Sequence, residues 1–268
     1  MVAVGNATWR WAVFLTDGTF SESCTAAVPV RALVEALRLC VNALGTPDVP
    51  VILAGVVPVT VKRLEKALRT RFRVYRFRRD FPCPLEIVPR PARAVGDDRL
   101  AAALGALALD AGVPWVVLDA GTALTVNAVR PLPAPGKGKR AGRRLGRFEG
   151  GLIVPGEALA LRVLHAGTAR LPALNPWSKG HAPAIGHSTG EAMRAGARRA
   201  QAAAACALAR AQAEQLGSRT RIALTGGGAE VLWPAVRREL WRWRPVFVPD
   251  LVLRGLYVAW QFHRMTEG

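Results

Sequence analysis

The feature that most constrains this chain is an acidic, glycine-containing turn between two apolar segments. Residues 115–118 read Trp-Val-Val-Leu and residues 126–129 read Val-Asn-Ala-Val, which predicts two buried strands joined by Asp119-Ala-Gly-Thr-Ala-Leu-Thr125. A glycine two residues after the aspartate permits a tight turn whose backbone N–H groups face outward, beside the hydroxyls of Thr122 and Thr125. These donors and one carboxylate suit a nucleotide phosphate and its cation. An ordinary β-turn is the alternative, because Asp-x-Gly sequences are common in turns.

The length and composition are those of a globular protein. The chain has 268 residues, 51% of them hydrophobic, and a mean hydropathy of +0.18, which is enough for one large domain or two smaller ones. The longest apolar segment, residues 100–129, is interrupted by Asp110, Pro114 and Asp119, so we expect no membrane span. The N-terminus lacks a basic segment followed by an apolar stretch, and the four cysteines form no Cys-x-x-Cys pair. We therefore expect a cytoplasmic protein with reduced thiols and no zinc site.

The net charge is strongly positive. The chain has 37 Lys+Arg against 19 Asp+Glu, a balance of +18, concentrated in residues 62–79 and 137–147. Such a surplus favours polyanions such as nucleic acid or acidic membranes. No helix-turn-helix, zinc-finger or aromatic–basic RNA-binding signature accompanies it. Because arginine, alanine and glycine are abundant together, we favour the compositional bias of a GC-rich genome, with solvated basic faces; a dedicated nucleic-acid site is the alternative.

Predicted strands and helices alternate along the chain, which indicates an α/β fold. The expected strands are a pair within 2–16 and segments 49–57, 115–118, 126–129, 222–224 and 245–248; the expected helices are 30–44, 61–70, 98–111, 157–165, 191–216 and a last one from Leu251. The proline-rich residues 81–93 read as irregular. Glycine-rich and acidic turns recur where strands end, which is where α/β sheets bind ligands.

Six short motifs follow one another, and their order is more specific than any one of them. They are Val4-Gly5-Asn6, Gly96-Asp97-Asp98-Arg99, residues 119–125, Gly150-Gly-Leu-Ile-Val-Pro-Gly156, Gly186-His-Ser-Thr189 and Thr225-Gly-Gly-Gly228. Over nearly the whole chain, this series resembles that of the type III pantothenate kinases, or Bvg accessory factor-like proteins. The resemblance implies two ribonuclease H-like domains of the acetate and sugar kinase/actin superfamily, which we expect at residues 1–113 and 114–268.

The resemblance also implies an activity: ATP-dependent phosphorylation of pantothenate in coenzyme A biosynthesis. Members of the family are cytoplasmic homodimers that use Mg²⁺ or another divalent cation together with K⁺ or NH₄⁺. On matching positions, Asp98 would be the base facing the pantothenate hydroxyl, and Asp119 would bind the monovalent cation. The other implied contacts are to pantothenate from Val88, Gly96, Asp97, Arg99 and Thr189, and to ATP from Val4, Gly5, Asn6, Arg10 and Thr122.

The chemistry of these residues agrees with such roles. Phosphoryl transfer needs positioning, charge neutralisation and a carboxylate for the attacking hydroxyl, which Asp98 supplies. Arg99 offers a planar fork to a carboxylate or a phosphate. Each has a structural alternative, because Asp98 near a helix start could be an N-cap, and Arg99 could form a surface ion pair with Asp97 or Asp98. The glycines of 150–156 and 225–228 permit close backbone approach, although ordinary turns use them equally.

The chain departs from the family pattern chiefly at the end that handles ATP and metal. The first family motif is Asp-x-Gly-Asn-Thr, whereas this chain has Ala3 for the aspartate and Ala7 for the threonine. Loss of a charged group at such a site commonly lowers the rate by orders of magnitude. Asp17 falls where a hairpin turn is expected, so we interpret it as a turn residue. The other departures are Val88-Pro-Arg-Pro91 for Tyr-x-Asn-Pro, Asn127 for an aspartate, and the basic run 137–147 for a short turn.

Two alternatives to an active pantothenate kinase follow from these departures. One is a catalytically impaired family member that acts as a regulatory or nucleic-acid-binding protein, motivated by Ala3, Val88 and the basic run. The other is a kinase for a different small acid that carries a hydroxyl, because Val88 and Arg90 alter the expected pocket wall.

Overall fold

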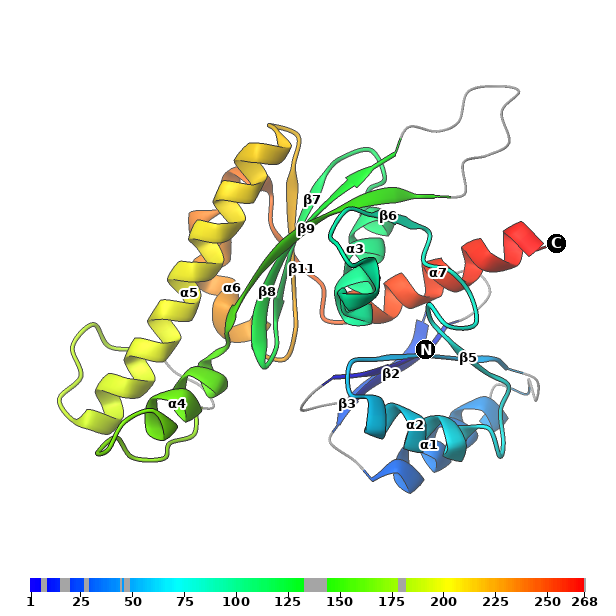
Figure 1. The fold of residues 1–268 in the computed structure, drawn as a ribbon, viewed down its shortest axis with the longest axis horizontal. Helices are drawn as coiled ribbons and strands as arrows, with labels where there is room; N and C mark the ends of the chain where they lie inside the picture. Colours follow the sequence, from blue (N-terminus) through cyan, green and yellow to red (C-terminus); the bar gives the residue numbers. More distant parts are fainter. Residues whose placement is uncertain are drawn as a thin grey trace. The chain divides into compact units, whose positions relative to one another are not determined.

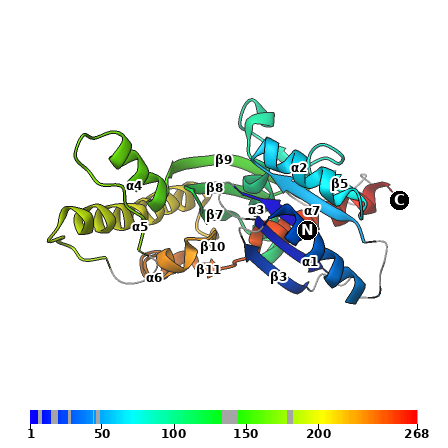
Figure 2. The same ribbon diagram turned by 90° about the horizontal axis from the view of Figure 1, so that it is seen from below.

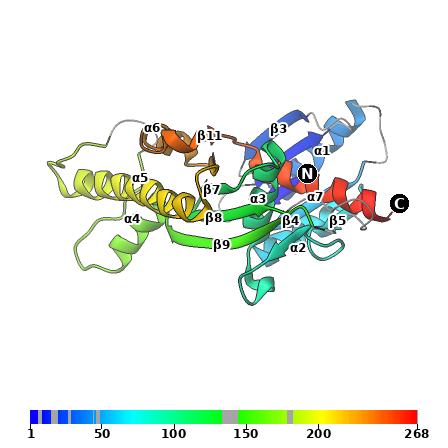
Figure 3. The same cartoon turned by 90° about the horizontal axis from the view of Figure 1, so that it is seen from above.

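The computed structural model describes residues 1–5, 9–14, 20–26, 29–43, 45, 49–132, 144–177 and 182–267, except for the side chains of 20–26 and 267. It forms two compact units (Figure 1; two further directions in Figures 2 and 3). Unit 1 is Met1–Ala111, Pro131–Phe148 and Asp250–Gly268, and unit 2 is Gly112–Arg130 and Glu149–Pro249. No helix among the described residues is long and apolar enough to cross a bilayer.

Unit 1 is built on a five-stranded sheet with the order β3-β2-β1-β4-β5. Its first elements are β1 (Val2–Val4), β2 (Trp9–Phe14), β3 (Phe20–Ala26), α1 (Val30–Ala43), β4 (Val51–Gly55), α2 (Pro58–Leu68) and β5 (Val74–Arg76). β2 is antiparallel to β1 and β3, whereas β4 is parallel to β1 and β5. The helices α1 and α2 cover one face of this sheet (Figure 1), because Leu37 of α1 and Leu64 of α2 are buried in one cluster with Val2 and Leu53 of the sheet.

Two further helices of unit 1, α3 (Asp97–Leu109) and α7 (Leu251–Glu267), pack on each other. Glycine makes the close approach of their backbones possible: a Cβ on Gly105 would meet the carbonyl of Leu251, and one on Gly255 would meet the carbonyl of Ala101. Aromatic residues attach α7 to the sheet, since Tyr257 stacks on Phe14 of β2 at 4.8 Å and Trp260 meets Tyr75 of β5 at 4.7 Å.

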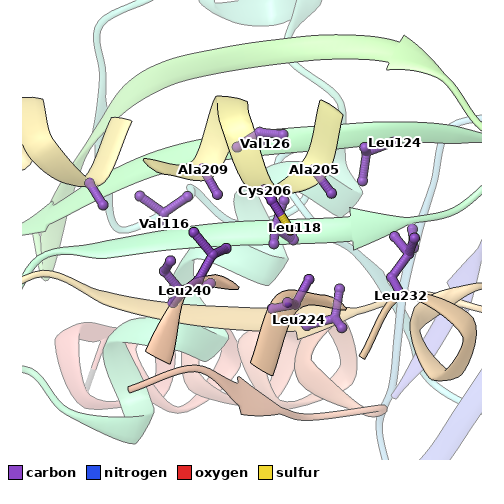
Figure 4. Packing of buried hydrophobic residues seen from close by; sticks show 14 of the residues in the cluster. Val116, Leu118, Leu124, Val126, Ala205, Cys206, Ala209, Leu224, Leu232 and Leu240 are labelled. Atoms are coloured by element: carbon purple, nitrogen blue, oxygen red, sulfur yellow. The ribbon is translucent and has the colours of Figure 1, made fainter. Parts of the chain in front are cut away.

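The second sheet has the order β11-β10-β7-β8-β9-β6. Its elements and the adjoining helices are β6 (Leu85–Ile87), η1 (Ala92–Ala94), β7 (Trp115–Ala120), β8 (Ala123–Pro131), β9 (Gly146–Pro155), α4 (Glu157–Ala166), α5 (Thr189–Leu216), β10 (Arg221–Thr225), α6 (Ala229–Glu239), η2 (Trp241–Trp243) and β11 (Val246–Phe247). Strand β9 begins in unit 1, where its first residues pair with β6. Within unit 2, Figure 4 shows Cys206 of α5 and Leu232 of α6 packed with Leu118 and Leu224 of the sheet.

The two sheets share one topology. Apart from the edge strand β6, the strands of each sheet, numbered in chain order, are arranged 3-2-1-4-5, with helices after the third and fourth strands. This duplication confirms the predicted α/β class and is the arrangement expected of two ribonuclease H-like domains. The domain boundaries 1–113 and 114–268 stay a prediction; the compact units break between Ala111 and Gly112, and α7 belongs to unit 1.

The sequence prediction is wrong or incomplete at several elements. Residues 81–93 are not irregular throughout, because they contain β6 and η1. The prediction also omitted β3, β5, β9, α6 and η2; β5 has only three residues, and α6 carries Pro234 in its interior, a residue that disfavours helix. Tertiary pairing decides β5 and β6, since each is too short to show periodicity. The predicted turn at 16–19 with Asp17 lies outside the described residues.

Candidate functional site

The acidic turn of unit 2 connects β7 to β8, as predicted, and glycines from two other segments donate hydrogen bonds to its carbonyl groups. Gly156, which directly precedes α4, donates its N–H to the carbonyl of Thr122 at 3.1 Å. Gly228, which directly precedes α6, donates to the carbonyl of Ala120 at 2.8 Å. The turn therefore lies against the N-terminal ends of two helices, where backbone N–H groups and helix dipoles favour an anion.

Asp119 stands at the carboxyl end of β7, in register with Thr225 of β10 and Thr125 of β8. Gly226 directly follows Thr225, the last residue of β10, and has φ +102. A Cβ on Gly226 would lie 2.5 Å from Asp119 Oδ1. Only glycine lets this backbone lie against the carboxylate. Asp119 and Thr122 are both half-buried. A carboxylate among backbone groups, next to a threonine hydroxyl, suits a cation and a phosphate.

The shared register of the two sheets identifies Ala3 as the counterpart of Asp119. In unit 1, Ala3 precedes Val4, which pairs with Gly55; a Cβ on that glycine would lie 2.9 Å from the Val4 carbonyl oxygen. In unit 2, Asp119 precedes Ala120, and a Cβ on Gly226 would lie 2.5 Å from the Ala120 backbone nitrogen. When Gly55 and Gly226 are matched, the methyl group of Ala3 in unit 1 corresponds to the carboxylate of Asp119 in unit 2.

The remaining predicted ATP contacts in unit 1 lie at and beside the end of β1. Val4 is buried, Gly5 is half-buried, and Asn6 lies outside the described residues, as does Ala7. Arg10 of β2 pairs in register with Ala3. Because cross-strand partners share one face of a sheet, the arginine is the charged neighbour of the position that lacks a carboxylate.

Unit 1 also gathers predicted pantothenate contacts at the N-terminus of α3. The helix begins at Asp97, so the N-cap position is Gly96, and the N-cap interpretation of Asp98 is wrong. Asp98 Oδ1 instead accepts the N–H of Arg99 at 2.8 Å and lies over Gly96, where a Cβ would be 2.5 Å away. Burial raises the pKa of Asp98 and outweighs the opposing hydrogen bond and charge of Arg99.

Arg78 holds the segment that leads into α3. Its Nη1 lies 3.1 Å from Asp97 Oδ1 and 2.6 Å from the carbonyl oxygen of Val95, and its Nη2 donates to the carbonyl of Ala92 at 2.8 Å. Arg78 itself has φ 65, uncommon for a residue with a side chain. Burial raises the pKa of Asp97 more than Arg78 lowers it. Asp97 thus pairs with Arg78, whereas the sequence offered Arg99 as its partner.

Phe148 brings Arg99 and Val88 together. The guanidinium carbon of Arg99 lies 5.5 Å from the centroid of the Phe148 ring, and Val88 donates its N–H to the Phe148 carbonyl at 3.1 Å. Burial is the main cause that lowers the pKa of Arg99, against the charge of Asp98. A guanidinium can rest its face on an aromatic ring while the N–H groups at its edge point towards an anion.

Thr189 is the first residue of α5 and is exposed. Side chains cap this helix start: Ser188 Oγ accepts the N–H of Glu191 at 3.2 Å, and Glu191 Oε2 accepts the N–H of His187 at 2.7 Å. Thr189 is in unit 2, as are Asp119 and Thr122, whereas the predicted contacts at Gly96 to Arg99, Val88 and Arg10 are in unit 1.

Two residues of this arrangement were missed from the sequence, Arg78 and Phe148. Both lie in arginine-rich segments that read as solvated basic faces, and no local pattern distinguishes them. Among the described residues, no group of three or more His, Cys, Asp or Glu side chains is arranged to hold a metal ion.

Comparisons of sequence agree with these features. The profile of the family described as type III pantothenate kinase matches residues 1–211. The chain is 37% identical to the type III pantothenate kinase of Akkermansia muciniphila over 172 residues, which are 64% of this chain and 62% of the relative. It is 31% identical to that of Synechococcus elongatus over 184 residues, 67% of this chain and 65% of the relative. The alignments thus span less than two thirds of these relatives.

Comparisons of structure report on the fold. A Campylobacter jejuni protein described as a Baf family transcriptional activator superposes with a TM-score of 0.55 at 16% identity, covering 99% of this chain and 98% of that one. The activator of 2-hydroxyisocaproyl-CoA dehydratase from Clostridium difficile gives 0.51 at 10% identity, covering 99% and 96%. These likenesses show the acetate and sugar kinase/actin fold. Because the family profile matches most of its length, this chain belongs to the type III pantothenate kinase family.

Proposed function

We propose that this protein is a kinase that transfers the γ-phosphoryl group of ATP to pantothenate, in coenzyme A biosynthesis. The observation that carries the proposal is the Asp98 carboxylate beside the Arg99 guanidinium at the start of α3, both half-buried, in a member of this family. The first group is suited to accept a proton and the second to hold an anion.

In the proposed reaction, Asp98 accepts the proton of the pantothenate hydroxyl while the hydroxyl oxygen attacks the γ-phosphorus and ADP leaves. The raised pKa of Asp98 makes this carboxylate a stronger base than an ordinary exposed aspartate. Arg99, resting on Phe148, is placed to pair with the substrate carboxylate, and Gly96 leaves room beside the base. We also assign contacts with pantothenate to Asp97, Val88 and Thr189.

We assign the phosphates of ATP to the turn after β7, with Thr122 as its hydroxyl donor, and to Val4, Gly5, Asn6 and Arg10. Support comes from the N–H-rich helix ends that meet this turn. The Clostridium difficile activator, which shares the fold, was solved with bound ADPNP. Asp119 fits a monovalent cation, because its carboxylate faces a backbone that is free of side chain at Gly226. We propose K⁺ or NH₄⁺ there, where it would offset phosphate charge.

The divalent cation is a different case. The residues of this chain do not fit a resident Mg²⁺ site at β1, since Ala3 offers a methyl group at the position that corresponds to Asp119. We propose that Mg²⁺ or another divalent cation arrives as part of the nucleotide substrate, held by its phosphates. Arg10, paired with Ala3, is then a protein charge beside that position, and slow turnover is expected.

We further propose that the protein acts as a homodimer in the cytoplasm. Support for the dimer comes from apolar side chains on β9 and α4 of unit 2, where Leu152, Ile153 and Val163 are 44%, 58% and 57% exposed. Light scattering after size exclusion tests the dimer: the mass should be about twice the 28.7 kDa of one chain, and Ile153→Asp with Val163→Asp should shift it to one chain.

A coupled assay of purified protein with pantothenate, MgATP and KCl tests the activity. Turnover should be detectable, should need K⁺ or NH₄⁺, and should collapse in Asp98→Asn but persist in the exposed control Glu214→Gln. No turnover at millimolar nucleotide with either Mg²⁺ or Mn²⁺ would contradict the proposal. Calorimetric binding of pantothenate without turnover would then support the impaired regulatory member, and turnover of another hydroxy acid alone would support a different acceptor.

A further inference from the structure

A second surface lies on unit 2 at the edge where its parallel strands begin, at the opposite end of β10 from the residue that pairs with Asp119. It centres on η2, which follows α6 and leads into β11. Trp241 of η2 is 69% exposed, whereas Trp243 packs against the core cluster of α5, α6 and the sheet. An indole this exposed is unusual, because tryptophan is highly buried on average.

Exposed arginines lie beside Trp241 in sequence and on α5 and α6, where α5 packs on α6 and α6 contacts η2. Arg242 and Arg244 flank Trp243 in sequence, and the pairing of Val246 with Ala223 places Arg244 beside the start of β10. Two helices that pack on each other supply the rest: Arg210 lies on α5, and Arg237 and Arg238 lie on α6. We call this set the Trp241 surface; it comprises Arg210, Arg237, Arg238, Trp241, Arg242 and Arg244.

The Trp241 surface has more positive charge than its neighbours neutralise. Arg238 lies 3.1 Å from Glu239, a pair whose side chains are 75% and 39% exposed, so it is well screened by water. Within the described part of the chain, no carboxylate lies within ion-pair distance of Arg237, Arg242 or Arg244. A flat aromatic face and unneutralised guanidinium groups thus occur together on one solvent-facing edge.

We propose that the Trp241 surface binds single-stranded nucleic acid. An unpaired base would stack on the indole of Trp241, and the arginines would neutralise the adjoining phosphates, the combination that sequence-tolerant single-strand binders use. A duplex fits less well, because its bases are stacked on one another and η2, with three residues, is too short to enter a major groove. This site is independent of the proposed kinase reaction, whose residues lie elsewhere.

Fluorescence anisotropy with the full chain and fluorescein-labelled 12-nucleotide oligo(U) and oligo(dT) tests the site, without ATP or pantothenate. Binding at low salt should weaken with KCl, with a slope of log K against log[KCl] near −3 for about four phosphate contacts. Trp241→Ala should weaken binding about tenfold, and Trp241→Phe, which keeps a ring, should lose less. The double variant Arg242→Gln/Arg244→Gln should reduce the slope by about 1.4. The two oligonucleotides distinguish RNA from DNA.

The matched control is Lys62→Gln/Lys66→Gln, which removes two exposed cations from α2 of unit 1; oligonucleotide binding should not change. Heparin provides negative charge without bases, so its binding should be insensitive to Trp241→Ala.

Equal affinity of wild type and Trp241→Ala for both oligonucleotides would overturn the proposal and leave a general polyanion surface, such as one for an acidic protein. Undetectable binding at 50 mM KCl would overturn it outright. Pantothenate phosphorylation should be unchanged in all these variants, whatever the outcome for the kinase.

Discussion

Arg78 and Asp97 form a largely buried ion pair, with Nη1 and Oδ1 3.1 Å apart and side chains that are 19% and 17% exposed. The same guanidinium binds the carbonyls of Ala92 and Val95, so one side chain fixes both the segment before α3 and the first residue of the helix. Asp98 and Arg99 follow directly, and their positions depend on this anchor.

Removal of Arg78 is therefore expected to affect the binding of the acceptor more than the chemical step. In Arg78→Ala the KM for pantothenate should rise about tenfold, with a smaller change in kcat, because the loop loses its hydrogen bonds while Asp98 remains. Arg78→Lys should recover little, since an ammonium group lacks the planar fork. Arg93→Gln, an exposed arginine on η1, is the control; an equal effect there would contradict the anchoring role.

Asp98 should set the acidic limit of activity. The carboxylate must be ionised to accept a proton, and burial raises its pKa above the ordinary value near 4. Activity should therefore fall as the pH decreases through a pKa higher than that of an exposed aspartate. In Asp98→Asn the rate should drop at least about 100-fold and this limb should vanish from the pH profile of kcat/KM. If the acidic limb of the pH profile is unchanged in Asp98→Asn, the group that titrates there is not Asp98.

Restoration of a carboxylate at residue 3 should accelerate the reaction. Ala3→Asp places a charged oxygen ligand at the position equivalent to Asp119, so kcat/KM should rise at least about tenfold and its dependence on Mg²⁺ should steepen. Ala3→Asn has nearly the same shape without the charge and is the control. If both variants behave alike, the missing carboxylate is not what limits turnover.

Asp119 should control the response to monovalent cations. In Asp119→Asn the concentration of K⁺ needed for half-maximal activity should rise at least about tenfold, because an uncharged amide attracts a cation less strongly than a carboxylate does. Titration with KCl at constant ionic strength, balanced with choline chloride, measures this directly. A K⁺ response identical to that of the wild type would place the cation elsewhere.

Glu65 of α2 should matter for stability at acidic pH. Hydrogen bonds from Arg79, and then from Arg76 and Arg69, lower the pKa of Glu65 to about 2 despite its burial. Because the folded pKa lies below the ordinary value near 4.3, this stabilisation is complete above that value and is lost as pH falls from about 5 to 2.

Glu65→Gln should accordingly lower the free energy of unfolding at pH 7 by about 2 kcal/mol, and by much less at pH 3, as measured by urea denaturation. The control is Glu35→Gln in α1, which removes an exposed partner of Arg38 and should leave stability nearly unchanged, because water screens an exposed ion pair. Equal losses in the two variants would show that the arginine cluster around Glu65 adds nothing.

Long, strongly patterned segments were predictable from the sequence. The α1 and α5 helices, the strand pair around the Asp119 turn and the helix that begins near Asp98 are found within a few residues of their predicted positions. Each contains its own signal, either apolar periodicity or a glycine-bearing turn. The short strands β5 and β6 contain no such signal, because pairing with β4 and β9 stabilises them.

The candidate site likewise has features that the sequence predicts and features that it does not. The order of the motifs, the resemblance to the family and the absence of an aspartate at residue 3 can all be read from the amino-acid order. Folding was needed to show that Arg78 rather than Arg99 anchors Asp97, that Phe148 supports Arg99, and that Ala3 corresponds to Asp119. These relationships join segments far apart in the chain, and burial and register, which arise only on folding, select one arginine among many. The acidic turn could be recognised from its own residues, whereas the distant segments that contact it could not.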